Sequence, residues 1–194
     1  MIVGMEDISD RDVVIRTRRG KTECYGEMVK RYQTSVFNVC YRMLGERREA
    51  EDLTQEAFIR AFERLHTYDQ ERPFGPWIRR IATNLCYNHL KRNIKSVFSL
   101  HEEIESKMHL RQRDPENKQI QRERSENIRT VILELPPHYR AVIELRHFQE
   151  LSYTEIAEVL NLPLSDVKSH LFRARKRLGA KLKAYKNEES HTSR

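Results

Sequence analysis

Apolar residues recur along most of this chain at spacings of three and four residues, the period of an α-helix with one buried face. Before residue 96 this pattern predicts four helices. They are a short helix that ends at Gly20, a longer one from Tyr25 to Gly45, one over about residues 48–65, and one from Trp77 to about Arg92. A loop over residues 66–76, with two prolines and a glycine, separates the last two.

The helical period returns at residue 128, after a stretch with a different composition. Residues 128–135 are periodic, Pro136-Pro137 interrupts the pattern, and another helix is expected from Tyr139 to Leu145. Residues 96–127 mix acidic and basic side chains, with few apolar residues after Ile104, which is typical of a linker. Its 32 residues would span ~48 Å as a helix or ~105 Å fully extended, enough to bridge one and a half to two turns of duplex DNA, ~50–70 Å.

Residues 152–178 carry the pattern of a helix-turn-helix. Ser152 and Glu155 form a capping box that begins a short helix, and Asn161 tolerates the left-handed conformation of a tight turn. Pro163 cannot continue the first helix, and Ser165 is expected to cap the second. Five apolar side chains would hold the two helices together: Ile156, Leu160, Leu162, Val167 and Leu171.

These elements predict an all-α protein of two small helical domains joined by a linker. We expect an N-terminal helical domain over residues 1–95, the linker over 96–127, a C-terminal helix-turn-helix domain over 128–186 and a polar tail over 187–194.

Charge indicates what the helix-turn-helix would bind. The chain has a formal net charge of +7, and residues 163–186 hold eight Lys or Arg against a single acid, Asp166. A helical hairpin with a solvated basic face is the alternative, but the coincidence of motif and charge favours a second helix that enters a DNA major groove.

A second basic stretch lies over residues 72–95, which contain six Lys or Arg and no acid. Aromatic residues interleave with it, and basic groups next to flat side chains suit single-stranded nucleic acid. Phe74 and Trp77 could instead be core residues, and the spacing of Trp77 favours the core. The acidic residues around Asp52, taken by composition alone, would be a solvated helix face.

Other chemistry is not supported by the sequence. The three cysteines are widely spaced and without a CxxC pair, so neither a disulfide framework nor a zinc site is expected. No nucleotide-binding loop, HExxH motif or paired carboxylates is found, so we expect no catalytic residue, no metal and no cofactor. The N-terminus lacks the apolar core of a signal peptide and no apolar run could span a membrane, which predicts a cytoplasmic protein.

Three segments resemble the bacterial RNA polymerase sigma factors. The segment from Asp52 to Phe62 (DLTQEAFIRAF) resembles the helix that binds the polymerase, and Trp77 to Asn84 (WIRRIATN) resembles the promoter-melting segment. Leu135 to Ile143 (LPPHYRAVI), with the helix-turn-helix after it, is similar to the C-terminal promoter-reading domain. Their order and spacing match the extracytoplasmic-function (ECF) group, over residues 25–182.

The resemblance implies a non-catalytic subunit that gives core RNA polymerase its promoter specificity. It implies as partners core polymerase, through its β′ clamp and β subunits, promoter DNA as duplex and single strand, and an anti-sigma protein. The core-binding residues would be Asp52, Gln55 and Glu56, with Leu53 and Phe58 in support. The −10 element would be bound by Phe74, Trp77, Arg79, Arg80, Asn84, Lys91 and Arg92, with Asn84 at a base edge. The −35 element would be bound by Lys168, Ser169, His170, Phe172, Arg173, Arg175 and Arg177.

Two residues depart from the family pattern. Asp166 stands where the family usually has Thr, and its carboxylate favours a helix N-terminus but would repel a nearby phosphate. His170 stands where the family often has Arg. A helix-turn-helix regulator that acts without core polymerase is the alternative reading. It explains residues 128–186 equally well and leaves residues 25–95 unexplained.

Overall fold

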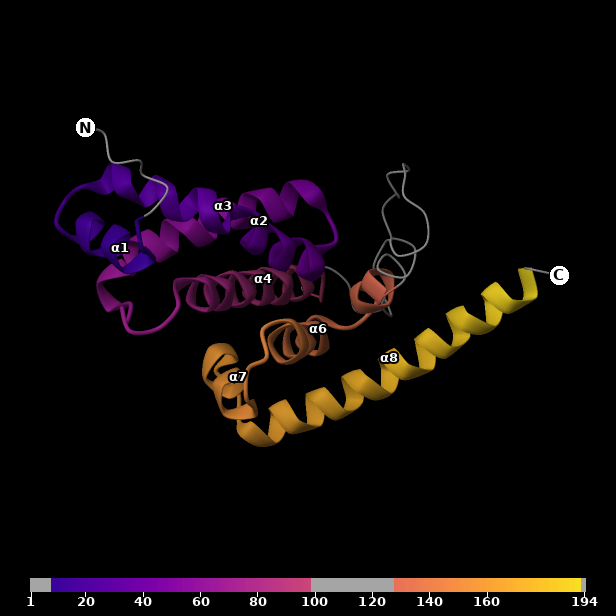
Figure 1. The fold of residues 1–194 in the computed structure, drawn as a ribbon. Coiled ribbons are helices and arrows are strands. Elements are labelled where there is room, and N and C mark those ends of the chain that lie inside the picture. Colours follow the sequence, from indigo (N-terminus) through magenta and orange to yellow (C-terminus); the bar gives the residue numbers. More distant parts are fainter. Residues whose placement is uncertain (1–7, 99–127, 193–194) are drawn as a thin grey trace.

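The computed structural model describes residues 8–98 and 128–192, and every regular element in those two ranges is helical. The expected all-α class is therefore confirmed. The predicted linker lies outside the described residues apart from 96–98, which end a helix. The α-helices are α1 (Asp10–Arg18), α2 (Tyr25–Leu44), α3 (Arg47–Glu63), α4 (Phe74–Phe98), α6 (Pro137–Ile143), α7 (Tyr153–Leu160) and α8 (Leu164–Thr192) (Figure 1).

The N-terminal body, residues 8–98, is built on α2, α3 and α4, which pack against one another in pairs (Figure 1). Their predicted apolar stripes form its core, with Met28, Val39 and Ile78 fully buried. Gly45 ends α2 in the left-handed conformation with φ of 80°, as its position in the sequence predicts. Glu46 then caps α3, because its carboxylate accepts the backbone N–H groups of the first turn.

The start of α4 differs from the sequence prediction. The loop was expected to run to Pro76, but the helix begins at Phe74. Proline is tolerated in a first helical turn because its missing N–H would have no partner there. Gly75 is also suited to this turn, since a Cβ atom would approach a ring carbon of Tyr32 to 2.8 Å.

Short connections complete the N-terminal body. Leu65–Thr67 form a 3₁₀ turn after α3, and Thr22–Cys24 form another before α2. The guanidinium of Arg18, at the end of α1, donates to the carbonyl of Leu65 at 2.5 and 2.9 Å and to that of Tyr68 at 2.5 Å. These bonds fasten α1 to the connection that leads into α4.

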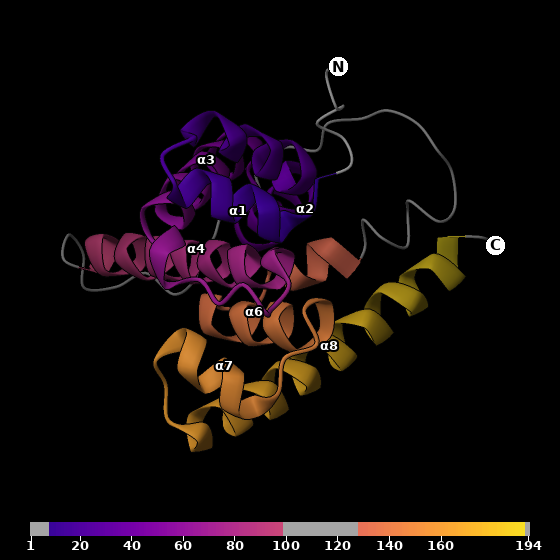
Figure 2. The same ribbon diagram turned by 60° about the vertical axis from the view of Figure 1, so that its left-hand side comes forward.

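The C-terminal body, residues 128–192, contains α6, α7 and α8. Residues 128–133 are helical, and a π-helical segment, Glu144–Phe148, follows α6 directly. α8 crosses beneath α6 and α7 and is the longest helix of the body (Figure 2). It continues through Thr192, so the backbone of the expected polar tail is helical at least to that residue.

The two bodies pack against each other along α4. α6 lies beside α4, and α2 and α3 cover the opposite side of α4 (Figures 1 and 2). The interbody interface therefore brings residues more than 60 positions apart in the sequence into contact, as in the hydrogen bond from the side chain of Gln149 to that of Thr83.

Candidate polymerase and promoter interfaces

The exposed face of α3 carries the residues expected to bind polymerase. Asp52 and Gln55 are exposed, and Glu56 is half-exposed and pairs with Arg60 at 2.7 Å, one turn further along. Such surface pairs within a helix contribute at most about 0.5 kcal/mol, so Glu56 remains available to a partner. Leu53 is half-buried, consistent with a supporting role.

Apolar side chains on the same helix change the expected contact set. Phe58 is 6% exposed and belongs to the core, where it supports α3 from beneath. Ile59 and Phe62 are 54% and 39% exposed, and sequence analysis did not select them. The signal was present, because both lie outside the apolar stripe that runs through Ala57 and Ala61.

Aromatic residues gather where α4 begins. Phe74 is fully buried, and its ring lies 5.4 Å from that of Tyr32, 5.5 Å from Tyr68 and 5.4 Å from Trp77, measured between centroids. Trp77 is half-buried and also contacts Tyr68, at 4.9 Å. In this conformation Phe74 is a core residue with no surface for stacking on a base, whereas Trp77 retains some exposed area.

The basic residues of α4 have different surroundings. Arg79 is half-buried, and burial lowers the pKa of its guanidinium. Arg80 donates to the carboxylate of Glu155 in α7 at 2.6 Å. Further along, Lys91 and Arg92 are exposed and have no carboxylate partner among the ion pairs of the described residues.

Amides on the same helix form a short polar row. The amide nitrogen of Asn88 donates to the amide oxygen of Asn84 at 3.1 Å, and the backbone carbonyl of Asn88 accepts from Arg92 at 3.3 Å. Asn84 keeps its own amide nitrogen for another partner, because only its oxygen is used in this bond. The arrangement can therefore offer both a donor and flanking positive charge to a nucleic acid.

The helix-turn-helix has the expected geometry at its turn. The hydroxyl of Ser152 accepts from the backbone of Glu155 at 3.2 Å, and the carboxylate of Glu155 accepts from the backbone of Ser152 at 2.9 Å. Asn161 is left-handed, with φ of 51°. The predicted cap at Ser165 is wrong: α8 begins at Leu164, and the carbonyl of Pro163 accepts the first backbone bonds.

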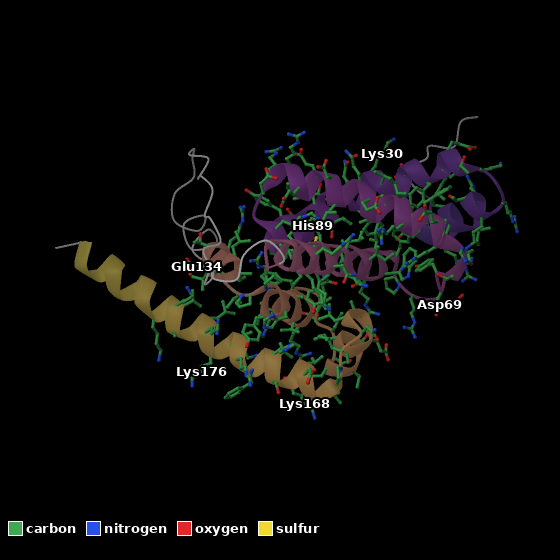
Figure 3. The ribbon with its side chains drawn as sticks, turned by 180° about the vertical axis from the view of Figure 1, so that it is seen from behind. Lys30, Asp69, His89, Glu134, Lys168 and Lys176 are labelled. Carbon is green, nitrogen blue, oxygen red and sulfur yellow. The ribbon has the colours of Figure 1, made fainter. Side chains whose placement is uncertain are left out.

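Side chains of the first turns of α8 divide into an outer set, which is exposed, and an inner set, which packs against α6. Phe172 is 69% exposed, the largest value among the exposed apolar residues, and Lys168, Ser169 and Arg173 are exposed as well. Lys168 and Lys176 project away from the N-terminal body (Figure 3). Outward apolar and basic groups on one helix match the requirements of major-groove reading, in which a ring contacts thymine methyl groups and guanidinium contacts guanine.

His170 belongs to the inner set. Its ring lies 4.8 Å from that of His138 and 5.7 Å from that of Tyr139, between centroids, and its Nδ1 atom is buried without a hydrogen-bond partner. Burial lowers the pKa of His138 to about 4, with further contributions from His170, Arg177 and Arg173. These imidazoles are therefore neutral near pH 7 and pack as flat side chains, which places His170 against α6 in this conformation.

Two arginines lie toward the rim of the same helix. Arg175 makes long hydrogen bonds to the ring of His147 at 3.4 Å and to the hydroxyl of Tyr153 at 3.5 Å. The guanidinium of Arg177 lies 5.3 Å from the ring centroid of Tyr139. Both are exposed, and neither pairs with a carboxylate in the contacts recorded for the described residues, so their charge remains available to an anion such as DNA phosphate.

Two other kinds of site are not found in the described ranges. Residues 8–98 and 128–192 contain no cluster of three His, Cys, Asp or Glu side chains able to hold a metal ion. None of the helices in these ranges is sufficiently long and apolar to cross a membrane.

Two family models match this chain, one in each helical body. The family model of sigma-70 region 2 matches residues 28–95, and that of sigma-70 region 4 matches residues 125–178.

The fold is similar to that of CnrH in complex with the cytosolic domain of CnrY, with a TM-score of 0.58, 23% identity, and coverage of 90% of this chain and 97% of that one. It is also similar to the sigma factor RpoE in complex with the anti-sigma factor NepR from Bartonella quintana, with a TM-score of 0.57, 22% identity, and coverage of 82% and 96%. Together these features define a sigma-70-type factor with regions 2 and 4.

Sequence relatives narrow the class. The chain is 36% identical over 176 residues to the ECF RNA polymerase sigma factor SigW of Bacillus subtilis, covering 87% of this chain and 94% of that one. It is 32% identical over 184 residues to the ECF sigma-E factor of Haemophilus influenzae, covering 91% and 97%. The chain belongs to the ECF sigma factors of RNA polymerase.

This membership settles the general function. The protein is a non-enzymatic, DNA-binding subunit that directs RNA polymerase to promoters, as the sequence resemblance implied. The alternative of a regulator acting without polymerase had left residues 25–95 without a role, and the region 2 match accounts for almost all of them.

Proposed function

We propose that the protein docks on core polymerase through α3, captures the −10 strand with α4, and reads the −35 duplex with α8. Docking through α3 is supported by its exposed face, which combines acidic and apolar side chains. Acidic Asp52 and Glu56 lie on the same helix as the exposed apolar Ile59, and Gln55 lies between them in sequence. Interfaces combine an apolar centre with a polar rim, so we assign this face to the β′ clamp.

Double charge reversal tests the assignment. Asp52→Lys with Glu56→Lys should weaken binding to core polymerase by about 2 kcal/mol or more, since two charges change sign. Glu23→Lys with Glu71→Lys is the matched control, because both residues are exposed and the net charge changes equally. Equal affinity of the two double variants for core enzyme in a pull-down titration would exclude the clamp assignment.

The −10 strand is proposed to lie along α4. Asn84 would contact a base edge, Trp77 would line the pocket of an unstacked base, and Arg79, Arg80, Lys91 and Arg92 would hold phosphates. Extruding one base costs a few kcal/mol, which stacking and edge hydrogen bonds can return. Phe74 is proposed to support the pocket from the core, through its contact with Trp77. Strand opening would then use binding energy alone.

The −35 duplex is proposed to contact the outer set of α8. Phe172 and Arg173 would read base edges with Ser169, Lys168 would lie at the margin, and Arg175 and Arg177 would hold phosphates. His170 would position the helix through its contact with His138. Run-off transcription with core enzyme on genomic fragments tests the whole assignment, because specific transcripts require both elements and the polymerase together.

A protein inhibitor is proposed as a further partner. The support is that RpoE, a fold neighbour, was solved with the anti-sigma factor NepR, and CnrH with the cytosolic domain of CnrY. We also propose the functional boundaries at residues 1–95, 96–127 and 128–186. Co-purification of the chain from its native cells, with and without excess core enzyme, would identify an inhibitor that competes with polymerase.

A further inference from the structure

The first turns of α8 carry one acidic side chain on an otherwise basic surface. α8 begins at Leu164, and Asp166, its third residue, is exposed. Residues 163–186 contain eight Lys or Arg and no other acid. Because phosphates dominate the charge of DNA, a carboxylate on the DNA-facing side of this helix weakens binding unless the duplex offers it a hydrogen-bond donor. The surroundings of Asp166 therefore bear on which base pair the helix prefers.

Asp166 lies on the same face of α8 as two residues of the outer set. It precedes Ser169 by three residues and Arg173 by seven, and side chains at these spacings lie on one side of an α-helix. Ser169 and Arg173 are exposed. Val167 and Leu171, which are buried, mark the side of α8 that packs against the rest of the body. The carboxylate therefore points in the same general direction as the groups proposed to read the −35 duplex.

Most of the acceptor capacity of Asp166 is unused within the described residues. Its carboxylate accepts one long hydrogen bond, from the hydroxyl of Ser165 at 3.3 Å. It takes part in none of the ion pairs found within residues 8–98 and 128–192. Nδ1 of His170, one turn further along, has no hydrogen-bond partner and so does not bind this carboxylate. An ionised carboxylate offers about four acceptor sites, which leaves several for a ligand.

The base edges of the major groove differ in what they offer a carboxylate. Cytosine presents the N4 amino group, which donates, whereas guanine presents N7 and O6 and thymine presents O4, which all accept. Adenine presents the N6 amino group beside the acceptor N7, so a carboxylate next to adenine meets one donor and one acceptor. A group that only accepts is therefore best matched to cytosine.

The first residues of a recognition helix are the ones that reach base edges in a helix-turn-helix complex. Asp166 occupies such a position, with Pro163, Leu164 and Ser165 exposed beside it. An acid in a first helical turn also interacts favourably with the helix dipole. That stabilisation is independent of DNA sequence, so a base preference that depends on Asp166 separates the two roles.

We propose that Asp166 is a specificity-determining residue, which selects cytosine at one position of the −35 element by accepting a hydrogen bond from its amino group. The inference rests on the proposed use of α8 for the −35 duplex. Seven helical residues separate Asp166 from Arg173, a rise of ~10.5 Å, which matches about three base-pair steps of ~3.4 Å. The selected cytosine therefore lies about three base pairs from the base pair that Arg173 contacts.

The test measures base preference at every −35 position for the full chain bound to core polymerase. Fragments of a promoter that this holoenzyme transcribes are pooled with the −35 element randomised, and bound and unbound fragments are sequenced. The wild-type chain should prefer cytosine by roughly 5- to 100-fold at one position. Asp166→Asn should move that preference to adenine, because an amide both accepts and donates and pairs with N6 and N7. Asp166→Thr should flatten the preference there.

Two further variants serve as controls. Glu158→Gln removes the same charge from an exposed site in α7, and it should leave the preference at every position unchanged. Arg173→Ala should flatten a different position, about three base pairs away. Circular dichroism should show that Asp166→Asn is folded at the temperature of the binding experiment.

Two results would overturn the assignment of Asp166. One is an Asp166→Asn variant whose base preferences equal those of the wild-type chain at every position. The other is an equal gain in affinity for all fragments, which would mean that the carboxylate only repels phosphates. Failure of the proposed role of α8 looks different: Phe172→Ala and Arg173→Ala would then also leave every −35 preference unchanged, and both proposals would fall.

Discussion

Replacing Phe74 with alanine should unfold the N-terminal body at a much lower temperature, whatever it does to promoter opening. The ring is fully buried and contacts Tyr32, Tyr68 and Trp77 at centroid distances of 5.4–5.5 Å. Burial of such a ring contributes about 1.5–3 kcal/mol, and each aromatic contact adds roughly 0.5–1.5 kcal/mol. Since neighbours relax into part of the cavity, we expect a loss of about 3–5 kcal/mol, the usual range for a buried Phe.

The assay for Phe74→Ala is thermal unfolding followed by circular dichroism, with Phe172→Ala as the matched control. A chain of this size loses about 2–4 °C of Tm per kcal/mol, so Phe74→Ala should lower Tm by roughly 6–20 °C. Phe172 is 69% exposed, so its removal should leave Tm nearly unchanged and weaken promoter binding instead. An unchanged Tm for Phe74→Ala, with loss of promoter opening alone, would refute the core assignment and return Phe74 to the DNA interface.

Three further predictions concern the C-terminal body. Arg173→Ala should cost about 1–3 kcal/mol at one −35 base pair in a binding titration over single-base variants, whereas Arg177→Ala should weaken all sequences equally and lower the salt dependence. The pKa of His138 falls from its usual 6.5 to about 4 on folding. The contribution of neutral His138 to the free energy of unfolding should therefore be complete above pH 6.5 and decline as the pH falls toward 4. The loss of stability is on the order of 1–3 kcal/mol after allowance for partial exposure. Urea titrations across this pH range should show a weaker pH dependence of the free energy of unfolding in His138→Phe. Ser152→Ala should cost about 1 kcal/mol by removing the α7 cap, seen as a lower urea midpoint; an unchanged midpoint would mean that the cap bonds add nothing in solution.

Because the chain is an ECF sigma factor, each of these measurements reports on a property that such a protein needs. Promoter binding and stability are distinct observables, and each prediction names the one that should change. Phe74→Ala and Ser152→Ala should lower stability, whereas Phe172→Ala and Arg173→Ala should weaken promoter binding.

Much of the local structure was determined by the sequence alone. Helical periodicity, with glycine and proline at the ends, placed α2, α3 and the helix-turn-helix, and the Ser152–Glu155 capping box formed as its spacing required. Caps and periods depend on residues within one or two turns, so a local pattern is sufficient to specify them. Ser165 is not the cap because α8 already begins at Leu164, and the carbonyl of Pro163 accepts the backbone N–H groups of Asp166 and Val167.

Tertiary packing decided which side of each helix remained available. Phe74 and His170 belong to motifs that suggest DNA contacts. The ring of Phe74 is nevertheless enclosed by Tyr32 of α2 and Tyr68 of the connection between α3 and α4, and His170 packs on α6. Ile59 and Phe62 are apolar yet remain 54% and 39% exposed, although the ring of Tyr25 in α2 lies 5.1 Å from that of Phe62. Arg140 and Glu144 gave no signal in the sequence, since their burial depends on Met43 and Arg42, about 100 residues away. Contacts between distant segments follow from how the two bodies meet, and neither periodicity nor composition carries that information.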